Sequence, residues 1–201
     1  MDELLLIRDA RKGDLDSFNR LVLAYQDMLY HQAYRLMGES EAAEDATQNA
    51  FISAYKNLKS FRGGSFKAWL LRIVTNGCYD ELRRKKRRPT TPLEPLNKED
   101  ERIESPKWLA DSAESPEEFS ERSELSRALQ HCLDKLPMDF RTVVVLVDIQ
   151  GLDYREASEA IGKPLGTVKS RLARARLRMR DCLGGFGELL PPAYRLVGES
   201  E

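Results

Sequence analysis

The chain contains 201 residues, and 32% of them are charged, yet its formal net charge at pH 7 is only −1. This length suffices for one large or two small domains, each with a hydrophobic core. We find neither a signal peptide nor an apolar stretch of membrane length, which favours a cytoplasmic protein without direct membrane insertion.

Cysteine and histidine usage argues against metal, cofactor or catalytic chemistry. Cys78, Cys132 and Cys182 are odd in number and lack CxxC spacing, which is typical of ordinary thiols in a reducing compartment. Two histidines are too few to complete a metal site with these cysteines. The sequence contains no nucleophile–histidine pair and no Gly-rich phosphate loop, so we expect neither enzyme activity nor a cofactor.

Helical periodicity dominates the chain and predicts an all-α fold. A short amphipathic helix is expected over residues 1–12, and an apolar stripe predicts a second helix from Asp14 to Leu36, ended by Gly38. Ser40 is expected to cap a third helix that ends near residue 58. A solvated polar face is the simpler interpretation of its outer side, which carries Glu41, Asp45 and Gln48.

The segment FRGGSF, residues 61–66, predicts a flexible loop with an aromatic residue at each end. Ser65 is placed to cap the next helix, which is expected from Phe66 to about Lys86. Basic, amide and aromatic groups share one face of this helix, a combination that fits contact with unpaired bases. An aromatic residue at helical spacing belongs more often to a core, so an aromatic side chain alone is a weak indication. The face consists of Trp69, Arg72, Asn76, Asp80 and Arg83.

Six successive cations, RRKKRR at residues 83–88, end this helix. Such a block repels itself unless an anion lies nearby, which favours a phosphate backbone over a merely solvated helix end. The stretch from Pro89 to Phe119 contains five prolines, and its nine acidic residues outnumber three basic ones, which predicts a linker without its own core. The predicted organisation is a helical domain over 1–88, an acidic flexible linker over 89–114, a second helical domain over 115–183 and a short tail over 184–201.

The second domain is expected to contain a helix over residues 138–149, followed by two helices joined by a tight turn. Asp153 and Glu156 have the spacing of a capping box at the start of the first of these helices. Gly162 and Pro164 end it, and the next helix begins near residue 165. This arrangement predicts a helix-turn-helix whose second helix enters a DNA major groove.

The second helix of this pair has a basic, acid-free side. Seven basic residues and no acidic residue occur between Lys163 and Arg180. A basic helical face is often only solvated surface, but small residues at the helix start favour close approach to phosphates. The candidate DNA-contacting residues are Gly166, Thr167, Lys169, Ser170, Arg171, Arg174 and Arg178.

Four segments, in this order, make the chain resemble the bacterial extracytoplasmic-function (ECF, group 4) sigma factors, the initiation subunits of RNA polymerase. They are AEDATQNAF (43–51), FRGGSFKAWLLRIVTN (61–76) with the basic block after it, LPMDFRTVVVL (136–146) and YREASEAIGKPLGTVKSRLARAR (154–176). The resemblance implies a sigma-2-like helical bundle and a sigma-4-like helix-turn-helix domain joined by the acidic linker. The implied partners are promoter DNA, the clamp helices of the largest subunit of core RNA polymerase, its flap region, and an anti-sigma factor that in this class is often membrane-anchored.

The resemblance also implies a role for individual residues. The recognition helix is expected to contact the −35 promoter element, and the linker to thread through the polymerase interior, where its acids mimic nucleic acid. Since the family usually has an acid at position 49, a weaker electrostatic contact with polymerase is expected here. The implied polymerase-binding residues are Asp45, Gln48, Asn49 and Ile52, and the implied −10 residues are Phe61, Arg62, Ser65, Phe66, Trp69, Arg72, Asn76, Asp80, Arg83 and Arg84.

The sequence is also compatible with two other classes of function. A stand-alone helix-turn-helix regulator would bind duplex DNA without polymerase. An interaction protein that sequesters polymerase or a regulator would leave the basic block and the arginine-rich helix unexplained.

Overall fold

The computed structural model describes residues 2–87 and 116–189, and for residues 116–122 it describes only the backbone. The predicted acidic linker and most of the predicted tail lie outside these ranges. Within them the regular elements are all helices, which confirms the predicted all-α class.

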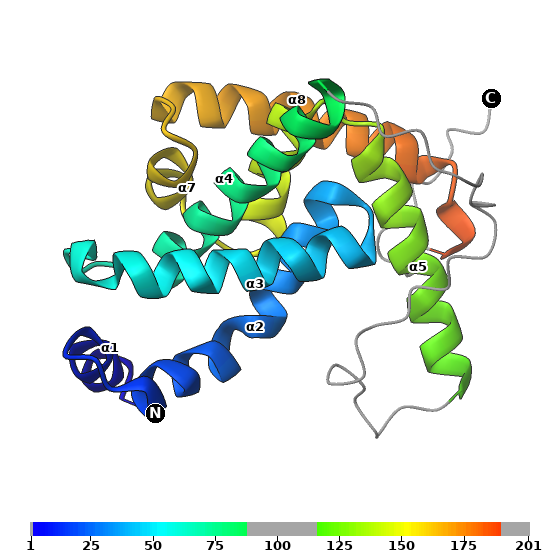
Figure 1. The fold of residues 1–201 in the computed structure, drawn as a ribbon. Helices are drawn as coiled ribbons and strands as arrows, with labels where there is room; N and C mark the ends of the chain where they lie inside the picture. The colour runs from blue at the N-terminus through cyan, green and yellow to red at the C-terminus, as the bar shows by residue number, and fades with distance from the viewer. Residues whose placement is uncertain (1, 88–115, 190–201) are drawn as a thin grey trace, which may run out of the picture.

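The N-terminal half is a bundle in which α2, α3 and α4 pack against one another, and α1 packs against α2 (Figure 1). Its core is apolar and closely packed, with Leu29, Leu36 and Leu70 fully buried. The elements are α1 (Glu3–Arg11), α2 (Leu15–Met37), α3 (Ser40–Asn57), the 3-10 turn η1 (Leu58–Ser60) and α4 (Phe66–Arg87).

Helix ends in this half follow from local chemistry. The Asp14 carboxylate accepts hydrogen bonds from the first turn of α2, and Gly38 ends that helix in the left-handed conformation with φ of 77°. The predicted cap of α3 is wrong by one residue: Glu39 occupies the N-cap position and makes no side-chain cap bond. Ser40 lies inside the helix, where its hydroxyl is 3.0 Å from the Tyr30 hydroxyl.

The C-terminal half contains the predicted helix pair and the helices that support it. The predicted helix over 138–149 is continuous, but its hydrogen bonding changes from α to π type at Val145. The elements are α5 (Pro116–Asp134), α6 (Met138–Val144), the π turn η3 (Val145–Ile149), α7 (Tyr154–Ile161), α8 (Leu165–Gly184) and the 3-10 turn η4 (Gly187–Leu189).

The expectation of three ordinary thiols is wrong for two of them. Cys132 in α5 and Cys182 in α8 form a disulfide with a Cα–Cα distance of 5.7 Å, although 50 residues separate them in sequence. The contact of α5 with α8 brings the two positions together. Cys78 is a free, fully buried thiol, and burial raises its pKa to about 12.

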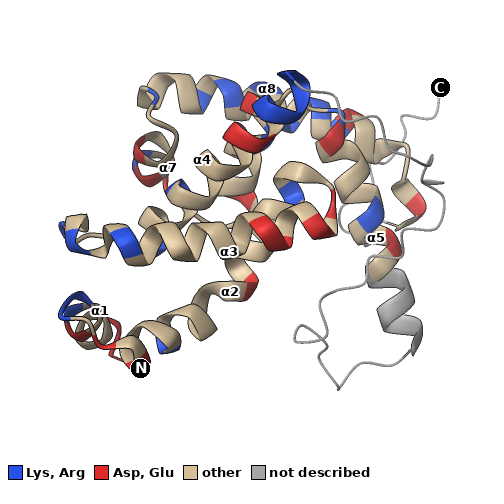
Figure 2. Ribbon diagram, viewed as in Figure 1, with Lys and Arg blue, Asp and Glu red and all other residues tan. Residues whose placement is uncertain are grey.

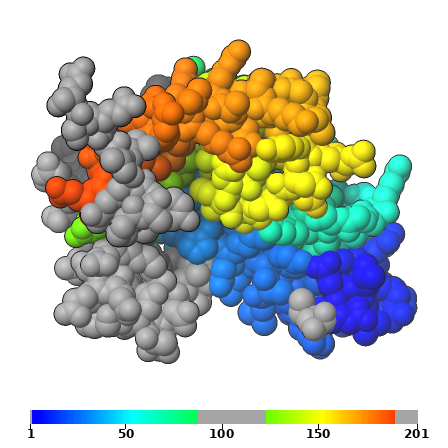
Figure 3. Space-filling model, turned by 180° about the vertical axis from the view of Figure 1, so that it is seen from behind, coloured from blue at the N-terminus to red at the C-terminus, as the bar shows by residue number. Residues whose placement is uncertain are grey.

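The two halves pack directly against each other. Helix α7 contacts α4, while α5, α6 and η3 contact α2. Seen from behind, the yellow and orange atoms of the C-terminal half lie against the blue and cyan atoms of the N-terminal half (Figure 3). Buried apolar residues of both halves therefore belong to one continuous cluster.

Candidate nucleic-acid and protein interfaces

The loop between η1 and α4 forms one wall of a cavity of about 590 Å³. Gly63 and Gly64 both have positive φ, 95° and 88°, a backbone shape that side chains with a Cβ rarely adopt. The Ser65 hydroxyl accepts a hydrogen bond from the Ala68 amide at 3.1 Å, so the predicted cap of α4 is confirmed. The cavity brings together predicted −10 residues from the loop and from α4, namely Phe61, Arg62, Ser65, Trp69, Arg72 and Asn76.

An aromatic cluster supports this loop from inside. The rings of Phe61, Phe66 and Trp69 contact one another, with centroids 5.3 to 5.4 Å apart. Phe66 is only 1% exposed, so its ring belongs to the core, as helical periodicity places it, and it is not positioned for the direct −10 contact that the resemblance implies. Trp69 is half-buried and lines the cavity, which leaves part of its ring available to a ligand.

Polar residues of α4 extend from the cavity toward the C-terminal end of the helix. Arg72, Asn76 and Asp80 are exposed at four-residue intervals on one side of the helix. Asn76 also lines a second cavity, of about 700 Å³, that lies between α3 and α4. Beyond it the Arg83 guanidinium lies 3.8 Å from Asp80, and that of Arg84 lies 2.8 Å from Glu81.

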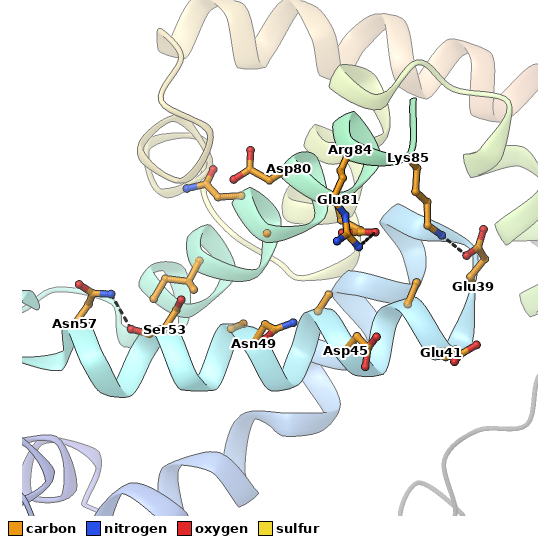
Figure 4. A pocket seen from close by; sticks show the side chains of 16 residues that line it. Glu39, Glu41, Asp45, Asn49, Ser53, Asn57, Asp80, Glu81, Arg84 and Lys85 are labelled. Atoms are coloured by element: carbon orange, nitrogen blue, oxygen red, sulfur yellow. Dashed lines mark hydrogen bonds and ion pairs between the residues drawn. The ribbon is translucent and has the colours of Figure 1, made fainter. Parts of the chain in front are cut away.

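The four predicted polymerase-contacting residues do not all line the same space. Figure 4 shows Asp45 and Asn49 on α3 on one side of it, with Asp80, Glu81 and Arg84 on α4 opposite. Gln48 and Ile52 instead line a groove of about 940 Å³ between α2 and α3, and Asp45 lies at the border of both spaces.

Beside the predicted Ile52, the groove between α2 and α3 contains apolar residues that were not predicted to contact a partner. Leu15 is 57% exposed, Ile52 46% and Tyr55 39%, and Phe18 and Val22 lie beside them. An exposed apolar strip bordered by polar residues is typical of a protein-binding surface. Leu15 and Tyr55 occupy positions that also fit the inward helical stripe, so periodicity alone does not distinguish them from core residues.

The helix-turn-helix has the predicted local structure. The Asp153 carboxylate accepts from the amides of Arg155 and Glu156, and the Glu156 carboxylate accepts from the Asp153 amide, which completes the capping box. Gly162 ends α7 in the left-handed conformation with φ of 61°. The apolar stripe of α8 is buried, and it consists of Val168, Leu172, Ala175 and Met179.

Cations occur along α8, as the blue segments of Figure 2 show, and none of them belongs to the buried stripe. Arg171 is ion-paired with Asp139 at 2.5 Å, and the Arg178 guanidinium lies 4.9 Å from the centroid of the Phe140 ring. Lys169 lies 5.7 Å from the Tyr154 ring centroid. Arg174 is exposed, and within the described ranges it makes neither an ion pair nor a ring contact. Gly166, Thr167 and Ser170 accompany these cations in the first turns of α8.

One further cation of α8 has a structural role. Arg176 donates two hydrogen bonds to Asp148 of η3, at 2.6 and 3.0 Å. These bonds raise the pKa of the Arg176 guanidinium and tie α8 to the π turn. The basic residues of α8 therefore divide into paired cations that position the helix and free cations available to an anion.

The described part of the chain contains no cluster of three or more potential metal ligands. None of its helices combines the length and the apolar character needed to cross a membrane.

Comparison with known proteins assigns both halves to one family. Residues 21–88 match Sigma-70 region 2, and residues 126–179 match Sigma-70, region 4. The ECF RNA polymerase sigma factor SigW of Bacillus subtilis is 38% identical over 178 residues, which are 88% of this chain and 94% of SigW. SigE of Mycolicibacterium smegmatis, an ECF RNA polymerase sigma factor, is 39% identical over 171 residues and 84% of this chain, but the match spans only 62% of that longer protein.

Solved structures agree with this assignment. The structure of CnrH in complex with the cytosolic domain of CnrY has a TM-score of 0.65 and 25% identity, covering 90% of this chain and 96% of that one. The sigma factor RpoE from Bartonella quintana, in complex with the anti-sigma factor NepR, has a TM-score of 0.63 and 25% identity, covering 83% of this chain and 96% of that one.

Proposed function

The chain belongs to the ECF family of RNA polymerase sigma factors, and from this premise we propose how its residues act in initiation. It is a sigma factor that directs promoter-specific transcription. We place it in group 4, with residues 1–88 as the sigma-2-like domain and 115–183 as the sigma-4-like domain. Such factors supply binding and strand opening, while core polymerase supplies the chemistry, so we assign no catalytic residue.

The cavity beside the loop is the proposed site for an unpaired base of the −10 element. Trp69 offers a ring face for stacking, and the Asn76 side chain offers both a donor and an acceptor for a base edge. Arg62 and Arg72 supply positive charge for the adjoining phosphates. Capture of an extruded base offsets part of the energy needed to unstack it. Phe66 is assigned a supporting role, because its ring is buried beneath the loop.

The exposed side of α8 is the proposed contact with the −35 element. Arg174 is the strongest candidate for a base contact, because it is exposed and free of ion pairs within the described residues. Arg171 becomes available only when it leaves Asp139. Gly166, Thr167, Lys169, Ser170 and Arg178 are assigned mainly to phosphate contacts that position the helix.

The groove between α2 and α3 is the proposed docking surface for the clamp helices of polymerase. It supplies apolar area through Leu15, Ile52 and Tyr55, while Asp45 and Gln48 supply polar contacts at its border. Asn49 lies on the other side of Asp45, facing α4, so its contribution to this contact is proposed to be small.

Further partners follow from the relatives. A structural neighbour is bound to an anti-sigma factor, which supports an anti-sigma factor as a partner of this chain. We propose a cytoplasmic site of action, with retention at a membrane only through such a partner. We also propose that the second domain contacts the flap region of polymerase and that the acidic linker passes through the polymerase interior.

Transcription by purified core polymerase on a genomic promoter library tests the proposal. Addition of the protein is expected to create start sites that share two spaced sequence elements. A stand-alone regulator would instead bind duplex DNA tightly without core polymerase and create no start sites. The observation that carries the sigma assignment is the joint match to regions 2 and 4 in the correct order.

A further inference from the structure

The cavity proposed to hold an unpaired −10 base is closed on one side by the other half of the chain. Its lining includes Glu156, Glu159 and Ala160 of α7, opposite Arg62 and Arg72. Helix α7 is the first helix of the helix-turn-helix, and it packs against α4. Two carboxylates therefore share the cavity that a DNA strand would need.

Hydrogen bonds from two residues of α4 outside the cavity lining hold this helix to the C-terminal half. The Lys67 ammonium donates to the Gln150 carbonyl oxygen at 2.5 Å, next to the start of α7. The Tyr79 hydroxyl donates to Asp139 at 3.1 Å and accepts from the Thr142 hydroxyl at 3.1 Å. Lys67 and Tyr79 lie outside the set of residues assigned to DNA contact.

Helix α2 provides a second set of contacts. The Arg141 guanidinium donates to the Leu36 carbonyl oxygen at 2.7 Å, and Arg35 donates to the Ser126 hydroxyl at 3.0 Å and to the Gln130 side chain at 3.2 Å. Burial lowers the pKa of both guanidinium groups, which nevertheless remain cationic. The interface is thus built from specific polar contacts around a shared apolar core.

The same interface reaches the helix that is proposed to contact the −35 element. Asp139 accepts from Tyr79 of α4 and also pairs with Arg171 of α8 at 2.5 Å. One carboxylate therefore joins the first domain to a DNA-contacting arginine of the second. Separation of the halves removes the Tyr79 contact from this carboxylate.

We propose that α7 is a built-in cover of the −10 site, held in place by Lys67 and Tyr79, and that it leaves the site when the chain engages polymerase and promoter. The proposal rests on the function assigned to the loop above. Elements centred about 25 base pairs apart lie about 85 Å apart along straight duplex DNA, whereas the two modules here touch. The closed arrangement therefore precedes promoter binding, and the carboxylates of Glu156 and Glu159 occupy the place of strand phosphates.

Only molecules in which α7 has left the cavity can bind single-stranded DNA. The apparent affinity therefore equals the affinity of this open state multiplied by the fraction of molecules that are open. The test uses the full chain without polymerase and a labelled single strand of random sequence, about 12 nucleotides long. Lys67→Ala combined with Tyr79→Phe is expected to tighten binding by roughly 5- to 30-fold, because three hydrogen bonds of the closed state are lost. Small-angle scattering is expected to show a larger radius of gyration for this variant.

Glu159→Gln tests the carboxylate by itself. Glu159 is exposed and makes no hydrogen bond or ion pair within the described ranges, so its replacement is expected to leave the fold intact and to tighten strand binding. Lys135→Ala and Glu124→Gln are the matched controls, because each removes one exposed charge outside the lining of the cavity, and neither is expected to change the affinity.

The possible outcomes distinguish two hypotheses, namely that α7 covers the cavity and that the cavity binds a −10 base. If the Lys67→Ala/Tyr79→Phe variant binds the strand with unchanged affinity, the proposal that α7 covers the cavity is wrong, whatever the radius of gyration of the variant. Loss of transcription in Asn76→Ala would still support the cavity as the −10 site. Tighter binding that an added Arg72→Ala does not reverse shows that the strand binds elsewhere, which overturns both. Tighter binding that Arg72→Ala reverses supports both.

Discussion

At the scale of single residues, the structure distinguishes cations that were equivalent in the sequence. Arg174 and Arg176 are two positions apart in the same basic run, yet Arg174 is free within the described ranges and Arg176 is bound to Asp148. A helical wheel places them on different sides of α8, but it does not identify the partner carboxylate in η3. The basic face of α8 was predictable from sequence. The ion pairs of Arg171 with Asp139 and of Arg176 with Asp148 could be identified only from the fold.

Replacement of Arg174 by alanine is expected to weaken use of the −35 element by about 1–3 kcal/mol, the range for a lost bidentate base contact. Competition between promoters with intact and scrambled −35 elements measures the effect. Arg180→Ala is the matched control, since Arg180 is an exposed cation of the same helix that pairs with Asp181. Equal losses in the two variants would show a general charge effect and argue against base contact by Arg174.

Replacement of Asn76 by alanine is expected to impair strand opening and to leave −35 recognition largely intact. The amide is exposed at the border of two cavities and provides the donor and acceptor needed to hold a base edge. Permanganate footprinting of unpaired thymines measures opening. A template with an already unpaired −10 region is expected to restore much of the activity. Normal footprints in the variant would contradict the base-capture role.

At the scale of elements, the sequence was most informative where local chemistry decides the structure. Gly38, Ser65 and Gly162 occupy the ends predicted for them, because left-handed glycines and hydroxyl caps act within one helical turn. The π turn was not predictable, since Val145 to Ile149 has ordinary helical periodicity. The burial of Phe66 agrees with its inward position in the apolar stripe of α4, and it is the direct −10 contact implied by the resemblance that the burial does not support.

The capping box of α7 yields a prediction about stability. Asp153→Ala removes the acceptor for two backbone amides at the start of the helix and is expected to destabilise the second domain by about 1 kcal/mol. Urea unfolding followed by circular dichroism measures the loss. Asp181→Ala removes an exposed aspartate of α8 that caps no helix and is expected to have little effect. Similar unfolding curves for Asp153→Ala and wild type would show that the box contributes little.

At the scale of the whole molecule, two features depend on how distant segments meet. The packing of α7 on α4 joins halves that the chain connects through the predicted linker, and periodicity carries no information on their relative placement. The pairing of Cys132 with Cys182 depends on the contact of α5 with α8. Cysteine number and spacing favoured thiols, because neither property reports which helices are neighbours.

The disulfide makes the stability of the second domain sensitive to reduction. Closure of a loop between residues 50 positions apart restricts the unfolded chain, and the bond is expected to contribute about 2–4 kcal/mol. Urea unfolding of the protein with and without a thiol reductant measures this difference. Cys78 is expected to stay unmodified by iodoacetamide in the folded state at pH 8, since burial raises its pKa to about 12 and the reactive thiolate is scarce.

A double variant supplies the control for this prediction. Cys132→Ser combined with Cys182→Ser is expected to unfold at the urea concentration of the reduced protein and to show no response to reductant. Its two serines replace one buried and one half-buried sulfur. Comparison with the reduced wild type therefore shows how much the polar hydroxyls themselves change the stability, apart from the loss of the cross-link. If mass spectrometry confirms the bond and the oxidised and reduced proteins still unfold together, the cross-link does not restrict the unfolded ensemble. The contact of α5 with α8 would then hold the domain together without it.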